Sequence, residues 1–483
     1  MNQSRLPVFT FLAAMLLVVA LPAQTISFDQ LPEAKSIIRN SVPKFIGYDS
    51  LNLVLIQHSG RLKNRLHLVR YNHSLQEQER ALLPSEDEST CYGGYINGSH
   101  IDLLFADMSD TGLCVYHDRH SLATLQSEDA PDVLFRHSGQ KGDDFVFANA
   151  VSPNGQLLAC VFVAQHDVQG TEIKVGLYDH QLEPYWTQTC SSATFSNVSV
   201  TDSGDIILYS ISAGGSCHFT ILDGEQELSV QFQLPQGDRV VQRELLRYGD
   251  GNILVASAVR HENHTLMPVG SNIDGIDIHC YNIKKKRLTT VHHTFTQQQV
   301  ARLTNDKENK QLRHFWVQFG QISQHIPDAD GAYLIIDQSW CTTLNNVPTT
   351  QQRMGMLVIR VDKDGNIQWS TSRRLNLSTR WESRYCLEHR WVPTPTGIML
   401  AWTDHLGNLT LPADSRVKTF TPFKNKASLN VWTLTPLGKE DLSFIELSRQ
   451  ALVGSAHLLD APGQYVLLLT SGRRQQLTKI TIE

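Results

Sequence analysis

The sequence predicts an all-β fold made of one repeated unit, and three observations support this. Helical periodicity is nearly absent along the chain. Short runs rich in Val, Ile, Leu and aromatic residues recur between tight turns, as strands do. The runs follow one order: strand, tight turn, strand, loop, strand, turn, strand. The clearest copy has its strands at residues 144–152, 156–164, 172–178 and 184–189.

The unit occurs eight times, and its second strands lie at residues 52–57, 101–106, 156–164, 205–210, 252–259, 332–337, 398–402 and 464–470. Four antiparallel strands per unit, repeated radially, are the sequence signature of a β-propeller. A lone four-stranded sheet exposes two apolar faces, and packing sheet against sheet around an axis covers both. We therefore expect an all-β β-propeller of eight four-stranded blades. A seven-bladed ring with one separate end unit is the alternative.

Two units resemble known propeller repeats. Residues 152–159, Ser-Pro-Asn-Gly-Gln-Leu-Leu-Ala, are similar to blades of TolB-like and WD-type (WD40-like) propellers. Residues 361–369, Val-Asp-Lys-Asp-Gly-Asn-Ile-Gln-Trp, resemble the quinoprotein-type repeat. The resemblance extends over most of the chain and is to the β-propeller repeat superfamily, with no specific family matched. It implies a fold, and a fold alone implies no chemistry.

The two ends of the chain carry predictions of their own. Residues 1–23 resemble a secretory signal peptide, because Arg5 precedes an apolar run at 6–20 and small residues follow. A membrane anchor is the alternative. Residues 24–483 are then one secreted or periplasmic propeller domain without a membrane span. The last unit ends after its third strand at 476–482, so we expect a strand at 25–31 to complete this blade and close the ring.

Composition narrows the function classes. The chain has 483 residues, of which 41% are hydrophobic and 19% charged, and a formal net charge of −6. This is the composition of a folded protein, and it lacks the basic surplus of a nucleic-acid-binding protein. The sequence contains no complete catalytic motif, so whether the protein is an enzyme stays open, with a non-enzyme favoured. We expect a monomer without cofactor or bound metal.

Cysteine spacing gives a further prediction. There are 8 cysteines, and no two have the C-x-x-C spacing of a zinc or redox site. Export would permit disulfides. We expect Cys160 and Cys280, which lie inside strands, to be buried thiols. The remaining cysteines fall near loops, and the expected disulfides are Cys91–Cys114, Cys190–Cys217 and Cys341–Cys386.

Loop length points to a binding face. The loops between second and third strands, and those between blades, leave the ring on one face. The insertions at 260–274, 339–352, 403–426, 297–312 and 371–387 all fall on this long-loop face, whereas turns on the opposite face are short. Insertions on one face of a repeat fold often mark its binding surface.

Side chains near these insertions suit ligand binding. Exposed Trp and Arg anchor ligands through stacking and paired hydrogen bonds, and Trp also stacks on sugar rings. The alternative is that the Trp residues belong to the core between blades, which explains Trp369 and Trp432. The His261–His264 segment, one residue short of a zinc-protease motif, is more simply a solvated loop. The candidate ligand-binding residues are Trp340, Trp381, Arg380, Arg384, His261, His264, Asp404 and His405.

The remaining motifs have structural interpretations. The segments at 328–331 and 362–365, each Asp-x-Asp-Gly, are expected to be β-turns because they lack the other calcium ligands. The basic run at 284–287 is expected to be a solvated hairpin turn. We therefore favour a binding module for a protein or glycan ligand. The alternative is a glycan-active hydrolase or lyase, whose carboxylate pair cannot be chosen from Glu262, Glu382 and Asp404.

Overall fold

The computed structural model describes most of the chain as strands and tight turns. The described residues are 26–30, 34–35, 44–48, 52–59, 65–72, 76–83, 89–109, 112–138, 144–154, 156–166, 170–179, 182–190, 195–235, 240–259, 273, 275–295, 317–328, 330–344, 347–380, 390–394, 396–408, 418–420, 426–447, 452–458, 464–471 and 474–482. The predicted signal peptide lies outside them. No helix in these ranges has the length and apolar character required to cross a membrane.

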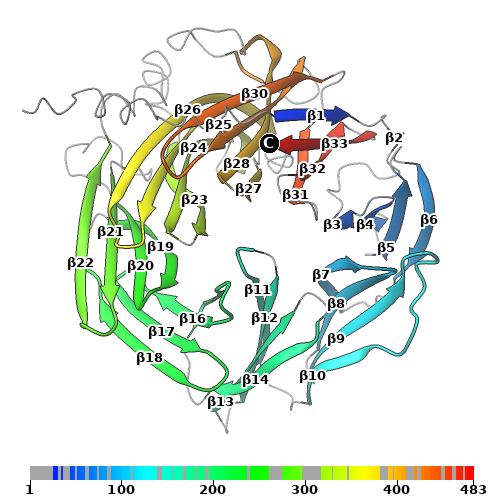
Figure 1. Ribbon diagram of the computed structural model, residues 1–483, viewed down its shortest axis with the longest axis horizontal. Helices are drawn as coiled ribbons and strands as arrows, with labels where there is room; N and C mark the ends of the chain where they lie inside the picture. Colours follow the sequence, from blue (N-terminus) through cyan, green and yellow to red (C-terminus); the bar gives the residue numbers. More distant parts are fainter. Residues whose placement is uncertain are drawn as a thin grey trace, which may run out of the picture.

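Seven four-stranded antiparallel sheets follow one another around a ring (Figure 1). We number these blades in chain order, and each is a meander of consecutive strands. Blades 1 to 3 consist of β3 (Lys44–Tyr48), β4 (Asn52–Ser59), β5 (Arg65–Asn72) and β6 (Glu77–Leu82); β7 (Ser89–Asn97), β8 (His100–Ser109), β9 (Gly112–Ser121) and β10 (Asp132–Ser138); and β11 (Asp144–Val151), β12 (Leu157–His166), β13 (Gly170–Asp179) and β14 (Pro184–Cys190).

The second half of the ring continues the same meander. Blades 4 to 7 consist of β15 (Asn197–Val200), β16 (Ile206–Ile211), β17 (Ser216–Leu222) and β18 (Glu227–Gln233); β19 (Val240–Gly249), β20 (Asn252–Val259), β21 (Gly275–Asn282) and β22 (Arg287–Thr294); β23 (Val317–Asp328), β24 (Gly331–Leu344), β25 (Val347–Asp362) and β26 (Ile367–Arg380); and β27 (Arg390–Thr394), β28 (Gly397–His405), β29 (Ala427–Leu434) and β30 (Glu440–Glu446). A short 3-10 helix, η3 (Leu406–Asn408), follows β28.

The remaining sheet contains both ends of the described chain and departs from the repeat. It has five strands: β31 (Leu452–Leu458), β32 (Gln464–Ser471), β33 (Arg474–Ile482), β1 (Ile26–Gln30) and β2 (Ala34–Lys35). Both β1 and β2 pair with β33, at Ile26↔Ile482 and Ala34↔Gln475 respectively. Figure 1 shows this terminal sheet between blade 7 and blade 1.

The prediction of eight four-stranded blades is therefore wrong, because seven sheets have four strands and the terminal sheet has five. The predicted closure, in which one N-terminal strand is the fourth strand of a regular last blade, is not shown either. Two short segments share the edge of β33 instead. Pro32 stands between them in the sequence, and proline lacks the N–H that a strand ladder requires.

Burial explains why each blade has this strand order. Every residue of β20 and of β29 is buried, because both faces of a second or third strand are covered by neighbouring blades. Fourth strands such as β22 alternate between exposed and half-buried residues. The apolar side chains of adjacent blades meet between the sheets. Phe162 of β12, for example, stacks on Phe135 of β10 with ring centroids 4.4 Å apart.

The Asp-x-Asp-Gly segment at 362–365 is a β-turn, as predicted, and residue 329 of the segment at 328–331 lies outside the described residues. The Oδ1 atom of Asp362 accepts hydrogen bonds from the backbone amides of Asp364 (2.9 Å) and Asn366 (2.8 Å). Gly365 takes φ +88°, a left-handed conformation that favours glycine. Residues 284–287 form an exposed turn between β21 and β22, also as predicted.

Two predicted insertions are strands. Most of the stretch at 339–352 belongs to the extended β24 and β25, and residues 371–380 belong to β26. Long hairpin strands satisfy backbone hydrogen bonds that an irregular loop would leave to solvent. Several tryptophan side chains belong to the core and not to a binding surface. Trp391, Trp402 and Trp432 are buried in the cluster between blades 6 and 7, and Trp369 packs against this cluster.

The cysteines form thiols where the structure describes them. The predicted Cys91–Cys114 and Cys190–Cys217 disulfides are wrong, because six described cysteines form no disulfide: Cys91, Cys114, Cys160, Cys190, Cys217 and Cys280. Strand β8 lies between Cys91 in β7 and Cys114 in β9, and two strand spacings are about 9.5 Å, too far for a disulfide. Cys190 and Cys217 belong to different core clusters, one on each side of blade 4. The prediction that Cys160 and Cys280 are buried is confirmed.

Candidate functional site

Most predicted site residues cannot be placed with their side chains. His261, His264, Trp381 and Arg384 lie outside the described residues. The backbones of Trp340 and Arg380 belong to β24 and β26, and their side chains lie outside the described part. Asp404 and His405, at the end of β28, are the two that are described in full.

Asp404 is a buried carboxyl. Its side chain Oδ1 accepts hydrogen bonds from the His405 backbone amide (2.6 Å) and from Nδ2 of Asn408 (2.9 Å). Burial raises the pKa of Asp404 to about 7, against the lowering effect of these two bonds and of Trp402. Nδ2 of Asn408 also donates to the carbonyl of Lys418 (2.8 Å). Asp404 therefore holds η3 and the 418–420 segment in place, which is a structural role.

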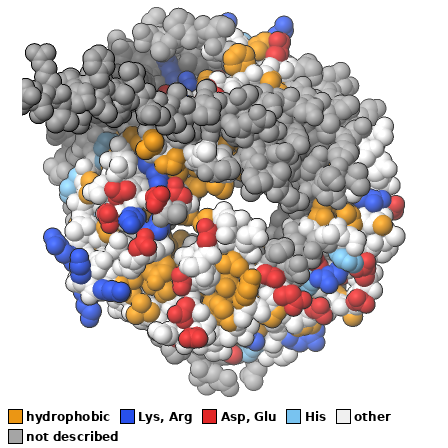
Figure 2. Space-filling model, viewed as in Figure 1, with side chains coloured by type: hydrophobic (Ala, Val, Ile, Leu, Met, Phe, Trp, Pro, Cys, Tyr) orange, Lys and Arg blue, Asp and Glu red, His pale blue; other side chains and the backbone are white. Residues whose placement is uncertain are grey.

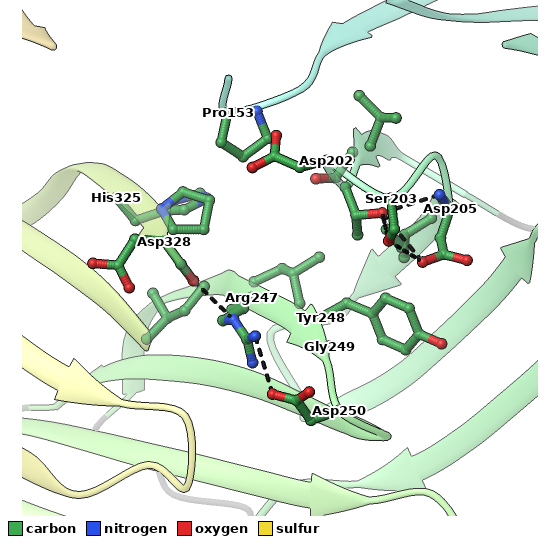
Figure 3. A pocket seen from close by; sticks show the side chains of 17 residues that line it. Pro153, Asp202, Ser203, Asp205, Arg247, Tyr248, Gly249, Asp250, His325 and Asp328 are labelled. Carbon is green, nitrogen blue, oxygen red and sulfur yellow. Dashed lines mark hydrogen bonds and ion pairs between the residues drawn. The ribbon is translucent and has the colours of Figure 1, made fainter. Parts of the chain in front are cut away.

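A cavity lies on the opposite face, where the first turns of four blades converge (Figure 3). Its volume is about 390 Å³. Blade 3 contributes Pro153, blade 4 residues 199–203, 205 and 207, blade 5 residues 245–250, and blade 6 residues 325, 327 and 328. We call this the turn-face cavity. It lies on the face of short turns and not on the predicted long-loop face.

One wall of the turn-face cavity is the turn between β15 and β16. Asp205 accepts hydrogen bonds from the hydroxyls of Ser203 (2.8 Å) and Thr201 (3.2 Å). Within this turn, the backbone amide of Asp205 donates a hydrogen bond to Oγ1 of Thr201 (3.0 Å). Asp202 Oδ1 accepts from the backbone amide of Asn154 in blade 3 (2.9 Å). Among the described residues, the donors to these two carboxylates are neutral, and neither carboxylate is paired with a cation there.

The floor of the cavity carries the guanidinium group of Arg247. Arg247 donates from Nε to the carbonyl of Asp328 (3.1 Å) and from Nη2 to the Asp250 carboxylate (3.2 Å). The carboxylate of Asp328 is itself paired with the buried Arg360 at 2.9 Å. Figure 3 shows the Arg247 contacts as dashed lines below the cavity. These pairs neutralise each other, and the surplus charge of the site is the negative charge of Asp202 and Asp205.

His325 of β23 faces the cavity from the side of blade 6 (Figure 3). Burial lowers the pKa of the imidazole, and the nearby Glu244 carboxylate opposes this effect only in part. The ring is therefore neutral at pH 7. No hydrogen bond to the ring is found among the described residues. His325 also borders a second cavity of about 260 Å³, with Glu244 and residues 322–324.

Blade 5 and blade 6 are joined beside this second cavity. The Gln242 side-chain amide donates to the carbonyl of Ile322 (3.0 Å) and accepts from the Ile322 amide (2.9 Å). One side chain thus satisfies a backbone donor and acceptor of the neighbouring blade. This pair fixes the position of β23, and with it that of His325.

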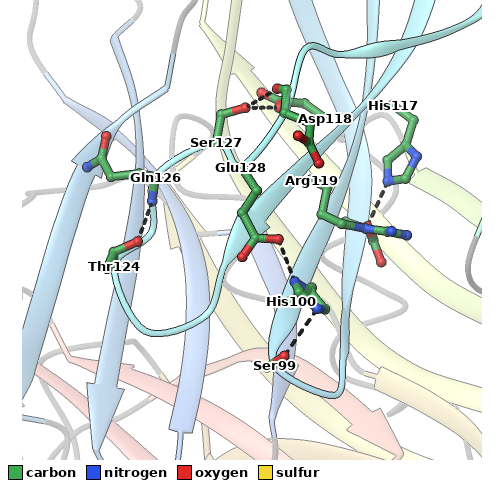
Figure 4. Close-up of polar contacts among 11 residues, drawn as sticks. Ser99, His100, His117, Asp118, Arg119, Thr124, Gln126, Ser127 and Glu128 are labelled. Atoms are coloured by element: carbon green, nitrogen blue, oxygen red, sulfur yellow. Dashed lines mark hydrogen bonds and ion pairs between the residues drawn. The ribbon is translucent and has the colours of Figure 1, made fainter.

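Blade 2 contains a separate polar network (Figure 4). His117 and Arg119 donate to the Oδ1 atom of the buried Asp102 at 2.7 and 2.8 Å. Burial acts to raise the pKa of Asp102, but these two partners bring it below its ordinary value. His120 and Ser127 contact Asp118 in the same way, at 2.9 and 2.7 Å. Both carboxylates are buried, so the network stabilises the blade and does not offer a site to a ligand.

The described carboxylates of the turn-face cavity accept hydrogen bonds from neutral donors, as Asp202 and Asp205 do, or pair with arginines, as Asp250 and Asp328 do. No group of three or more His, Cys, Asp or Glu residues in the described part could hold a metal ion. In the sequence, residues 201–204 and 249–251 are the short turns that precede the second strands at 205–210 and 252–259. Their repetition at one position in successive blades was the available signal for a shared site.

Comparison with known proteins adds little to this description. No protein family matches the chain, and no curated protein matches it. Among solved structures, it is similar to the WD40 domain of SCAP from fission yeast, with 9% identity, 95% of this chain and 96% of that chain covered, and a TM-score of 0.35. It is also similar to the β-propeller domain of the trilobed protease from Pyrococcus furiosus, with 10% identity, coverage of 81% and 95%, and a TM-score of 0.36.

An apocarotenoid oxygenase variant from Synechocystis shows a similarity of the same order, with 9% identity, coverage of 93% and 97%, and a TM-score of 0.37. Similarities at this level carry no argument about function. The assignment of the propeller fold depends on the described sheets themselves.

Proposed function

We propose that the chain is an exported β-propeller binding module for a protein or glycan ligand, and that the turn-face cavity is its ligand site. The export part of the proposal depends on residues 1–23, which have the pattern of a signal peptide. Edman sequencing of the protein purified from its native host tests it. A mature N-terminus near residue 24 is expected, and retention of Met1 would contradict export.

One observation supports the binding role most directly. The cavity is bounded by four successive blades, and its volume of about 390 Å³ falls within the usual range for ligand pockets. It combines apolar residues such as Leu245 and Pro327 with a few charged groups held by hydrogen bonds. Polar groups held in this way need little reordering when a ligand binds, which reduces the entropic cost.

The long-loop face stays a separate prediction. Asp404, its one buried candidate, is occupied by contacts with η3, and His405 accepts a hydrogen bond at Nδ1 from the Gly407 amide (2.9 Å). Trp340, Trp381, Arg380 and Arg384 retain the chemistry of ligand anchors. Both faces can therefore be compared in one experiment.

The experiment is a glycan-array and pull-down screen with the mature chain, repeated with variants. Ser203→Trp places a large side chain at the cavity, and Ser229→Trp makes the same change on the exposed outer strand of the same blade. We expect Ser203→Trp to abolish binding of any ligand found and Ser229→Trp to leave it unchanged, with both variants folded by circular dichroism. If Ser203→Trp binds normally and deletion of 260–272 abolishes binding, the ligand site is on the long-loop face.

A further inference from the structure

We propose that the turn-face cavity binds a lysine or arginine side chain of a partner polypeptide, with its cationic group beside the acidic turn that carries Asp202 and Asp205 and its aliphatic stem along the apolar wall. This inference rests on the proposed function and specifies its ligand. Three features of the cavity support it: its charge, its apolar surface and the neutral imidazole of His325.

The charge of the site is the first feature. Arg247 is occupied by Asp250 and by a backbone carbonyl, and Asp328 is occupied by Arg360. In the part of the chain that the structure describes, Asp202 and Asp205 have neutral donors only. Figure 2 shows Asp and Glu side chains interspersed with Lys and Arg side chains beside the central opening of the ring. An anionic ligand would be repelled here, whereas an ammonium or guanidinium group would form charge-assisted hydrogen bonds.

The pKa of Tyr248 is affected by the same negative charge. Burial, and next the charge of Asp205, raise the pKa of its hydroxyl above the ordinary value. Tyr248 is among the residues that border the cavity, and its side chain packs against the core cluster between blades 4 and 5.

The apolar surface is the second feature. Val200, Ile207, Leu245, Leu246 and Pro327 line the cavity together with the carboxylates. Lysine and arginine pair a charged end with a long hydrocarbon stem that packs on such surfaces. A hydrated sugar has no comparable stem, and a free metal ion would gain nothing from the apolar wall.

His325 is the third feature, because it points to a ligand independently of the acidic residues. Its ring is half-buried, faces the cavity and makes no hydrogen bond within the described part of the chain. A partner polypeptide can satisfy it through a backbone amide or carbonyl beside the basic residue. The other ionisable groups that line the cavity are Asp202, Asp205, Arg247, Tyr248, Asp250 and Asp328.

The test measures binding of short fluorescent peptides that are identical except for a central lysine, glutamine or glutamate. Fluorescence anisotropy with the full mature chain gives the dissociation constants. We expect the lysine peptide to bind at least tenfold more tightly than the glutamine peptide and the glutamate peptide to bind weakest. Asp202→Asn and Asp205→Asn should each weaken lysine-peptide binding about tenfold, the low end for a hydrogen bond to a charged group, because these sites are partly exposed.

The matched control is Asp223→Asn, in the turn between β17 and β18 of blade 4. Its carboxylate caps the backbone amides of Glu225 and Gln226 and lies outside the cavity. We expect lysine-peptide affinity to be unchanged in this variant. Raising the salt concentration should weaken the lysine peptide more than the glutamine peptide, because screening acts on the charged pair.

Different failures have different meanings. Equal affinity for the lysine, glutamine and glutamate peptides, abolished by Ser203→Trp, would refute the cationic ligand and leave the cavity as the binding site. Glycan binding that Ser203→Trp abolishes would refute it in the same way. Lysine-peptide binding that Ser203→Trp leaves unchanged, or no binding by any peptide, would refute the cationic ligand at this cavity.

Discussion

Asp404 gives a prediction whose sign can be worked out from its surroundings. Asp404 is 6% exposed, and the pKa of its carboxyl is about 7 in the folded protein, against an ordinary value of 3.8 for aspartate. Below pH 3.8 the carboxyl is protonated in both the folded and the unfolded state, so its ionisation does not lower the free energy of unfolding. As pH rises from 3.8 to 7, the unfolded state loses its proton first and becomes progressively favoured. Stability is therefore lost across this window.

The substitution Asp404→Asn removes the ionisable group and keeps an oxygen acceptor for the His405 amide and the Asn408 side chain. The full shift corresponds to about 4 kcal/mol at ~1.36 kcal/mol per pKa unit. Local opening and water penetration reduce this figure, so we expect a gain on the order of 1–4 kcal/mol in the free energy of unfolding at pH 8. At pH 4 the gain should vanish.

Urea unfolding followed by tryptophan fluorescence at pH 4, 6 and 8 measures the effect. The control is Asp132→Asn, an exposed residue of β10, which should change stability by less than about 0.5 kcal/mol at each pH. A variant Asp404→Asn that is less stable than the parent at pH 8, or equally changed at pH 4 and pH 8, would refute the reasoning.

Three further predictions concern the fold. Trp432→Ala should lower the free energy of unfolding by about 3–5 kcal/mol because the indole is fully buried between blades 6 and 7, while Tyr185→Ala, on an exposed side chain, should have little effect in the same thermal or urea unfolding assay. Gln242→Leu should cost about 1–3 kcal/mol through loss of both hydrogen bonds to Ile322, and the exposed Gln231→Leu should be near neutral; equal effects would contradict the inter-blade role. Mass mapping of the unreduced protein should find Cys91, Cys114, Cys190 and Cys217 alkylated as thiols, and a Cys91–Cys114 peptide would contradict the strand order.

The repeat was predictable because its cause is local. Strands such as β12 and β20 are continuous apolar runs, bounded by turns that contain Gly, Asp or Asn, and these signals fix the strand positions to within a few residues. The predicted strands at 172–178 and 184–189 correspond to β13 and β14. The turn at 362–365 was predictable for the same reason, since an Asx side chain closes its own turn.

Features that depend on distant contacts were not predictable. The pairing of β1 and β2 with one edge of β33 makes a five-stranded sheet, and sequence patterns do not report how many segments share an edge. Cys91 and Cys114 both fall near the looped end of one unit, but the intervening β8 separates them. The stretch at 339–352 lacks strong alternation, yet its backbone continues β24 and β25.

The cavity was missed for a related reason. Its walls come from short turns in four blades, and each turn by itself has an adequate structural explanation. Loop length drew attention to the opposite face. Only the placement of Asp202, Asp205 and His325 around one space shows that the short turns form a shared site.

Hydrogen–deuterium exchange of the mature chain, with and without the lysine peptide, tests the central claim most directly. The account predicts slower exchange of the backbone amides at 199–205 and 247–250 on binding, with no change at 403–408. Protection confined to 403–408, or no protection at the cavity despite measurable binding, would contradict it.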